Sequence, residues 1–94
     1  MLEPTSHDVF TDVVSELSGN DEMLFANGFN EALIGYVERS GLPPLALYDA
    51  DKCIEIIMEK YDLPYDEAKY SFNYNTKGSY VGENTPAFAT ILVK

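Results

Sequence analysis

The residues Tyr48–Phe88, YDADKCIEIIMEKYDLPYDEAKYSFNYNTKGSYVGENTPAF, decide the fold of the chain. Apolar residues recur at helical spacing over 50–61, and Asp49 stands directly before them as a favourable N-cap. A second helix is predicted over 65–77, because Pro64 suits the first turn of a helix. Since the linker between the two helices is short, we expect them to pack as neighbours.

The segments 31–37 and 45–49 are short and apolar, and they contain β-branched and aromatic residues, which favours two strands of a hairpin. Pro43 and Pro44 are expected in the connection, where no ladder N–H is needed. The alternative is a helix over 29–39, because periodicity alone does not separate a short strand from a buried helix.

A final strand is predicted over 87–93, and we expect it to pair with that hairpin. Gly82, in the loop before it, is an expected positive-φ residue. The sequence therefore predicts an α+β domain of two layers over 27–94. In this domain the helices 50–61 and 65–77 pack on a three-stranded antiparallel sheet of 31–37, 45–49 and 87–93.

An acidic helix is predicted ahead of this domain, over 6–18, within an N-terminal segment of residues 1–26. Apolar residues recur along it at helical spacing: Val9, Phe10, Val13, Val14 and Leu17. The opposite face carries three carboxylates, one turn apart, from Asp8, Asp12 and Glu16. Two interpretations stay open. The carboxylates are either the solvated face of a surface helix or a surface that binds a basic partner.

Negative charge is concentrated at the front of the chain. The net charge is −10, from 16 acidic and 6 basic side chains, and all eight charged residues before Arg39 are acids, Asp21 and Glu22 among them. This balance repels nucleic-acid phosphates and anionic membranes, so we expect neither to bind directly. The sequence also has no apolar run long enough to span a bilayer, and its N-terminus does not read as a signal peptide.

Residues that carry catalytic chemistry are scarce. The chain has one histidine, His7, and one cysteine, Cys53, which falls on the apolar side of the helix 50–61 and is expected to be buried and unreactive. Two nitrogen or sulfur ligands fall short of a zinc site, and the sequence contains neither an EF-hand loop nor a P-loop. We therefore expect no enzymatic activity, no metal and no cofactor. A single cysteine also fits a reducing cytoplasm.

The best candidate for a binding loop is SYVGENTP, residues 79–86, between the second helix and the last strand. Tyr80, Glu83 and Asn84 are its candidate partner-binding residues, because tyrosine is enriched in interface cores and the two others offer polar contacts. The alternative is that Gly82, Asn84 and Pro86 form a turn and nothing more.

Three segments carry a resemblance to a known family: NGFNEALIGYVERSG (27–41), PPLALYDADKCIEIIMEK (43–60) and FNYNTKGSYVGENTPAF (72–88). Through them, residues 27–94 resemble a family of small uncharacterised proteins of bacteriophages and prokaryotes. The resemblance implies a phage-type accessory protein in a bacterial cytoplasm, and it implies no activity. The acidic helix lies outside it, and Pro64 stands where the family often has a small polar helix cap.

The leading hypothesis is a non-enzymatic protein that binds a host or phage protein. In its sharper form, the acidic surface mimics nucleic acid and inhibits a partner that has a basic nucleic-acid-binding surface. One alternative is self-assembly, as a homodimer through the edge strand 87–93 or the N-terminal helix. A second alternative is a small-molecule-binding domain.

Overall fold

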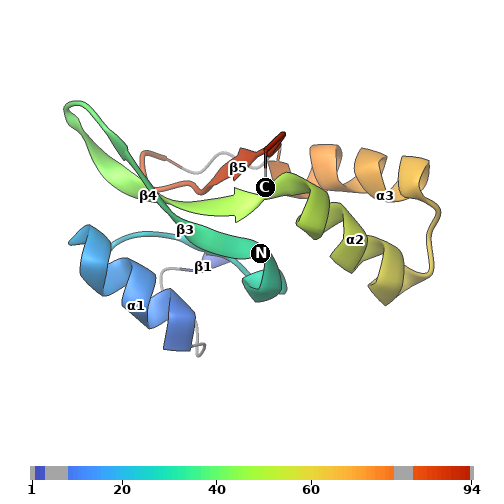
Figure 1. Ribbon diagram of the computed structural model, residues 1–94, viewed down its shortest axis with the longest axis horizontal. Helices are drawn as coiled ribbons and strands as arrows, with labels where there is room; N and C mark the ends of the chain where they lie inside the picture. The colour runs from blue at the N-terminus through green and yellow to red at the C-terminus, as the bar shows by residue number, and fades with distance from the viewer. Residues whose placement is uncertain (1, 4–8, 78–81, 94) are drawn as a thin grey trace.

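The computed structural model describes residues 2–3, 9–77 and 82–93. It confirms a small α+β fold in which helices pack around a three-stranded sheet (Figure 1). A separate antiparallel ladder joins β1 and β2. In chain order the elements are β1 (Leu2–Glu3), α1 (Val9–Ser18), β2 (Phe25–Ala26), η1 (Asn30–Ala32), β3 (Leu33–Arg39), β4 (Leu42–Asp49), α2 (Ala50–Tyr61), α3 (Tyr65–Ser71), η2 (Phe72–Lys77) and β5 (Ala87–Ala89).

The β3–β4 hairpin confirms the predicted pair of strands and rules out a helix over the whole of 29–39. A single 3₁₀ turn, η1, precedes β3, so the first strand begins two residues later than predicted. The second strand begins three residues earlier than predicted, because the turn lies at Ser40–Gly41. Gly41 has a φ of +75°, a conformation that glycine adopts without strain.

Pro43 and Pro44 lie inside β4, which corrects their predicted place in the connection. The pairing shifts register beside them, because the stretch Leu42–Leu45 of β4 spans one residue more than Val37–Arg39 of β3. Such a bulge tolerates proline, since it interrupts the ladder that would need the missing N–H. The two prolines therefore shape the strand instead of ending it.

β5 pairs with β4 in parallel, so the sheet of order β3-β4-β5 is mixed and the predicted all-antiparallel pairing is wrong. The loop before β5 explains the direction. Arg39 Nη2 donates to the carbonyl oxygens of Pro43, over 2.7 Å, and Glu83, over 2.9 Å, which holds this loop beside the first half of β4. The chain then enters β5 next to Leu47 and runs the same way as β4.

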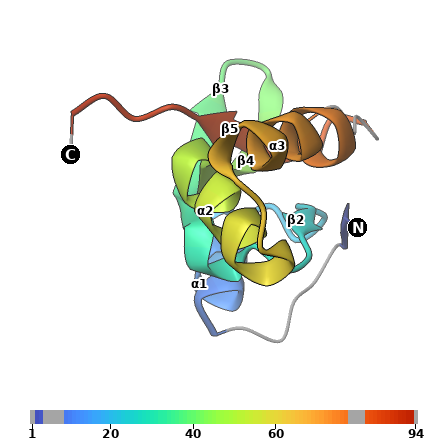
Figure 2. The same cartoon turned by 90° about the vertical axis from the view of Figure 1, so that its right-hand side faces the viewer.

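The last strand is also shorter than predicted. It ends at Ala89 instead of residue 93, and the chain after it runs away from the sheet (Figure 2). Leu92 and Val93 are consequently exposed. The apolar character of these residues suggested a strand, but no neighbour in the described part of the chain pairs with them.

The two predicted helices are confirmed, and they pack against each other (Figure 2). α2 has the predicted bounds, and its N-cap is Asp49, whose Oδ1 accepts from the N–H groups of Asp51 and Lys52. The second helix covers the predicted 65–77 in two parts, because α3 continues as the π-helical segment η2.

α1 begins at Val9 in the described part of the chain, and the first residues of the predicted helix, 6–8, lie outside it. The helix packs against β3 and β4 (Figure 1). Its buried face holds Thr11 and Val14. On the same side, Ser15 Oγ donates to the carbonyl of Asn20 over 3.2 Å, so the helix is oriented in part by a polar contact.

The main core joins the N-terminal segment to the domain. Met23, Phe25 and Ala26 belong to the same buried cluster as the inner faces of α2 and α3. Tyr48 is central to this cluster: its hydroxyl accepts from the N–H of Ala26 over 2.8 Å, and its ring lies 5.4 Å from that of Phe88. The segment 23–26 thus contributes directly to the core of the fold.

Candidate functional site

The predicted binding loop is used largely for internal contacts where the structure describes it. Glu83 is exposed, but its carbonyl accepts from Arg39. Asn84 is half-buried, and its Oδ1 accepts from Asn20 Nδ2 over 2.9 Å. Gly82 has a φ of +123°, as predicted, and its carbonyl accepts from the hydroxyl of Thr85 over 2.8 Å. These contacts favour the turn-forming interpretation of this segment.

Asn20 is the reason that Asn84 is held so firmly. Its Nδ2 donates to Asn84 and also to the carbonyl of Pro44, each over 2.9 Å, and its Oδ1 accepts from the N–H of Glu22. One side chain therefore joins the N-terminal segment, the β4 bulge and the loop before β5. The sequence pattern did not single out Asn20 for this role.

The predicted acidic residues are placed on the surface wherever they are described. Asp12, Glu16, Asp21 and Glu22 are all exposed. Asp8 and Tyr80 lie outside the described residues. Asp12 and Glu16 are one turn apart on α1, so their carboxylates lie on the same side of the helix.

The outer side of α1 also carries apolar side chains, which the sequence pattern would place inward. Phe10 is 42% exposed, Val13 39% and Leu17 69%. Val14 is buried as predicted, together with Thr11, whereas Phe10, Val13 and Leu17 lie beside the carboxylates. We call this surface the α1 outer face, and it comprises Phe10, Asp12, Val13, Glu16 and Leu17.

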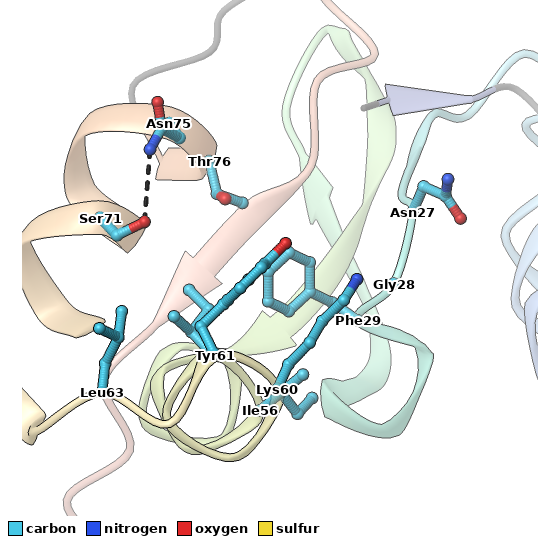
Figure 3. Close-up of a pocket in the computed structure, with 11 residues that line it drawn as sticks. Asn27, Gly28, Phe29, Ile56, Lys60, Tyr61, Leu63, Ser71, Asn75 and Thr76 are labelled. Atoms are coloured by element: carbon cyan, nitrogen blue, oxygen red, sulfur yellow. Dashed lines mark hydrogen bonds between the residues drawn. The ribbon is translucent and has the colours of Figure 1, made fainter.

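A pocket of about 620 Å³ lies on the other side of the molecule, between the C-terminal half of α2 and the end of the α3–η2 helix (Figure 3). The third wall is the turn Asn27–Gly28 and the following Phe29, where Gly28 has a φ of +90°. We call it the α2–α3 pocket. Its lining residues are Asn27, Gly28, Phe29, Ile56, Ile57, Lys60, Tyr61, Leu63, Ser71, Asn75 and Thr76.

The end of α2 positions the floor of this pocket. Asp62 takes the left-handed conformation with a φ of 53°, and the N–H of Leu63 donates to the carbonyl of Met58 over 3.1 Å. This ending turns Leu63 back toward the helix and into the pocket. Lys60 and Tyr61 extend side by side from the last turn of α2, with their polar ends pointing away from the helix (Figure 3).

None of the pocket residues was singled out by sequence reasoning. The signal available was weak: Lys60 and Tyr61 follow the apolar residues Ile56 and Ile57 by one turn each, a spacing that every amphipathic helix shows. The pocket depends on how far α3 and η2 stand from α2, which local sequence patterns do not specify.

The two buried groups with shifted pKa values are structural. Burial raises the pKa of the Cys53 thiol to about 12, with a further contribution from the negative charge of Asp49. Cys53 is free and fully buried, as predicted. Burial also raises the pKa of Tyr48 to about 12, despite the hydrogen bond from Ala26. Both pKa values lie far above neutral pH, so Cys53 is not present there as the reactive thiolate.

Among the described residues, no three His, Cys, Asp or Glu side chains come together as a metal site requires. The helices of the described part are all too short or too polar to cross a membrane. Comparison with protein-family models, with curated proteins and with solved structures finds no match to this chain.

Proposed function

We propose that the chain is a non-enzymatic accessory protein that binds another protein through the α1 outer face. The observation that supports this most is the orientation of α1, which leaves Phe10, Val13 and Leu17 exposed. Exposing these side chains to water is unfavourable, and apolar surface gathered in this way is typical of protein–protein contacts. A partner that covers the stripe would gain that burial on binding.

The carboxylates define the chemistry of the partner. Asp12 and Glu16 lie on the α1 outer face, Asp21 and Glu22 follow in the next connection, and the chain has a net charge of −10. A complementary surface combines an apolar groove with Lys or Arg at its rim, because opposite potentials speed association and exclude wrong partners. Nucleic-acid-binding proteins display such basic surfaces.

The proposed action is therefore competition with nucleic acid for the basic surface of a host or phage protein, which inhibits that protein. We further propose that this action takes place in the cytoplasm of an infected bacterium, which is what the resemblance of residues 27–94 implies. In this proposal α1 is the binding element, and the domain formed by residues 27–94 supports it.

Capture from bacterial lysate tests the proposal. The intact chain is compared with two α1 variants, Asp12→Asn/Glu16→Gln and Val13→Ser/Leu17→Ser. The matched control is Glu55→Gln/Glu59→Gln, which removes two exposed carboxylates one turn apart on α2. We expect a nucleic-acid-binding protein to be retained by the intact chain and the control and lost from both α1 variants. Adding the intact chain to that purified protein should release its bound nucleic acid, less so at high salt.

Two results would oppose the proposal. A partner that remains bound at high salt to Asp12→Asn/Glu16→Gln excludes charge mimicry. The second comes from the molecular mass measured by light scattering. If the intact chain is a dimer and Leu17→Ser is a monomer, the α1 outer face serves self-association.

A further inference from the structure

We propose that the α2–α3 pocket binds a small monoanionic compound with a flat apolar ring, of the class of the aromatic carboxylates. The proposal is independent of the α1 outer face, because none of the pocket residues belongs to it. It rests on the size of the pocket, the charge of its lining and the placement of its aromatic rings.

The pocket has the size of a small-molecule site. Its volume of about 620 Å³ falls within the range of roughly 300–1,000 Å³ that small-molecule sites occupy. Phe29, Ile56, Ile57 and Leu63 make the lining mainly apolar, and polar groups stand around them. Small-molecule sites share this arrangement, in which an apolar lining supplies affinity and a few polar groups fix orientation.

The charge of the lining selects the sign of the ligand. Among the lining residues in the described part of the chain, Lys60 is a cation and none is an acid, although the whole chain has a net charge of −10. The Lys60 ammonium is held 5.5 Å from the centroid of the Tyr61 ring. One cation balances one negative charge, so a monocarboxylate fits better than a phosphate ester that carries two.

The aromatic residues select the shape of the ligand. The Phe29 ring is buried at the back of the pocket, and Tyr61, which is 60% exposed, stands in front of it beside Lys60 (Figure 3). A flat ring placed against Tyr61 would cover its exposed face, and stacked rings attract each other beyond the area that they bury. A carboxylate on that ring would then lie near Lys60 and hydrogen-bond to its ammonium.

The opposite wall supplies neutral polar groups. Ser71, Asn75 and Thr76 come from the end of α3 and from η2, and Asn75 Nδ2 donates to Ser71 Oγ over 3.3 Å (Figure 3). A π-helical segment carries extra residues per turn, changes the direction of the side chains that follow, and occurs frequently at functional sites. Here it brings Asn75 and Thr76 to the pocket.

Nuclear magnetic resonance titration of the full ¹⁵N-labelled chain tests the proposal, with 2-naphthoate as the probe, neutral 2-naphthamide as its isostere, and adenosine monophosphate as a dianionic aromatic probe. We expect 2-naphthoate to shift the amide signals of Lys60, Tyr61 and Asn75, with a Kd of about 0.1–1 mM for a ligand of this size. The amide should bind about tenfold more weakly, because it loses the charge-assisted hydrogen bond.

Two variant pairs locate the site. Lys60→Met should bring the affinity for 2-naphthoate down to that for 2-naphthamide. Lys52→Met is the control, because it removes a charge from the same helix outside the pocket, and it should leave the affinities for both compounds unchanged. Asn75→Trp should fill the pocket and abolish the shifts. Asn73→Trp, an exposed position of η2 outside this pocket, should not.

The proposal is overturned if 2-naphthoate causes no shifts up to about 10 mM, a limit weaker than any expected Kd. Equal affinity for the carboxylate and the amide on the unmodified chain, or tighter binding of adenosine monophosphate, would also overturn it. These comparisons need no variant, so they hold even if a substitution disturbs the fold.

Discussion

The α1 outer face and the α2–α3 pocket are opposites in shape and in charge. The first is one side of a helix, carries carboxylates beside exposed Phe10, Val13 and Leu17, and belongs to the part of the chain that has acids only. The second is concave, and its one charged lining residue in the described structure is Lys60. We therefore propose two kinds of partner, a macromolecule with a basic surface for the first and a small anion for the second.

The two regions also differ in how they are held. α2 and η2 place Cys53, Ile57 and Phe72 in the core. Over residues 10–18 of α1, the buried residues are Thr11 and Val14, and Ser15 and Ser18 form hydrogen bonds with Asn20. The helices that form the pocket are therefore held by apolar packing. α1 is held by a few buried side chains together with hydrogen bonds to Asn20. This distinction predicts different responses to substitution.

The largest expected effect is on the pocket side. Phe72 is 1% exposed, and its ring packs edge-on against that of Phe88 at 5.2 Å. Phe72→Ala should lower the free energy of unfolding by about 3–5 kcal/mol, as measured by urea denaturation, because it leaves a cavity between helix and sheet. Tyr74→Ala, on the exposed side of η2, should cost less than about 1 kcal/mol. Equal costs would mean that η2 does not pack as described.

Alkaline pH probes the core that the two regions share. The pKa values of Tyr48 and Cys53 are raised to about 12 from 10.0 and 9.0, so their contribution to stability is complete below pH 9. Above that pH the unfolded chain loses these protons before the folded chain does, and stability falls until both folded groups have ionised near pH 12. We expect a loss of about 3–4 kcal/mol between pH 9 and 11 in urea denaturation.

Cys53→Ala is the control for this pH dependence. It removes one of the two groups and should make the alkaline loss shallower, while the other ionisable groups stay the same. An unchanged slope would show that burial of the thiol is not the cause.

A smaller effect is expected at the polar support of α1. Asn20→Ala removes the hydrogen bonds to Pro44 and Asn84 and should cost about 1–2 kcal/mol in free energy of unfolding. Hydrogen exchange should quicken in α1 more than in α2, because the anchor belongs to the N-terminal segment. Asn73→Ala, an exposed asparagine of η2, is the control and should change neither measurement. Uniform acceleration in both helices would contradict the distinction.

Local patterns predicted the elements whose causes are local. The bounds of α2, its N-cap Asp49 and the burial of Cys53 all follow from residues within one or two turns. The direction of β5 did not, because it depends on Arg39 holding a loop that lies far along the chain. The bulge at Pro43 and Pro44 was missed for a similar reason. Proline usually indicates the end of a strand, and only the pairing with β3 shows that these two prolines lie at a bulge inside β4.

The candidate site was predictable to the same extent. Exposure of Asp12 and Glu16 follows from their charge, and the structure agrees. The exposure of Leu17 reverses the usual inference from helical periodicity, because α1 packs on β3 and β4 with Thr11 and Val14 buried and Leu17 on the opposite side. The sequence did not predict the pocket, because the pocket is formed by the spacing between elements and not by the local sequence of any one of them.

The orientation of α1 underlies the proposed function, and one pair of substitutions tests it directly. Val14→Ala should lower the free energy of unfolding by about 1.6 kcal/mol, at about 0.8 kcal/mol for each buried carbon removed. Leu17→Ala removes more carbon from a side chain that is 69% exposed and should change it by less than about 0.5 kcal/mol. Urea denaturation in which Leu17→Ala costs more than Val14→Ala would place the apolar stripe inward and contradict the α1 outer face.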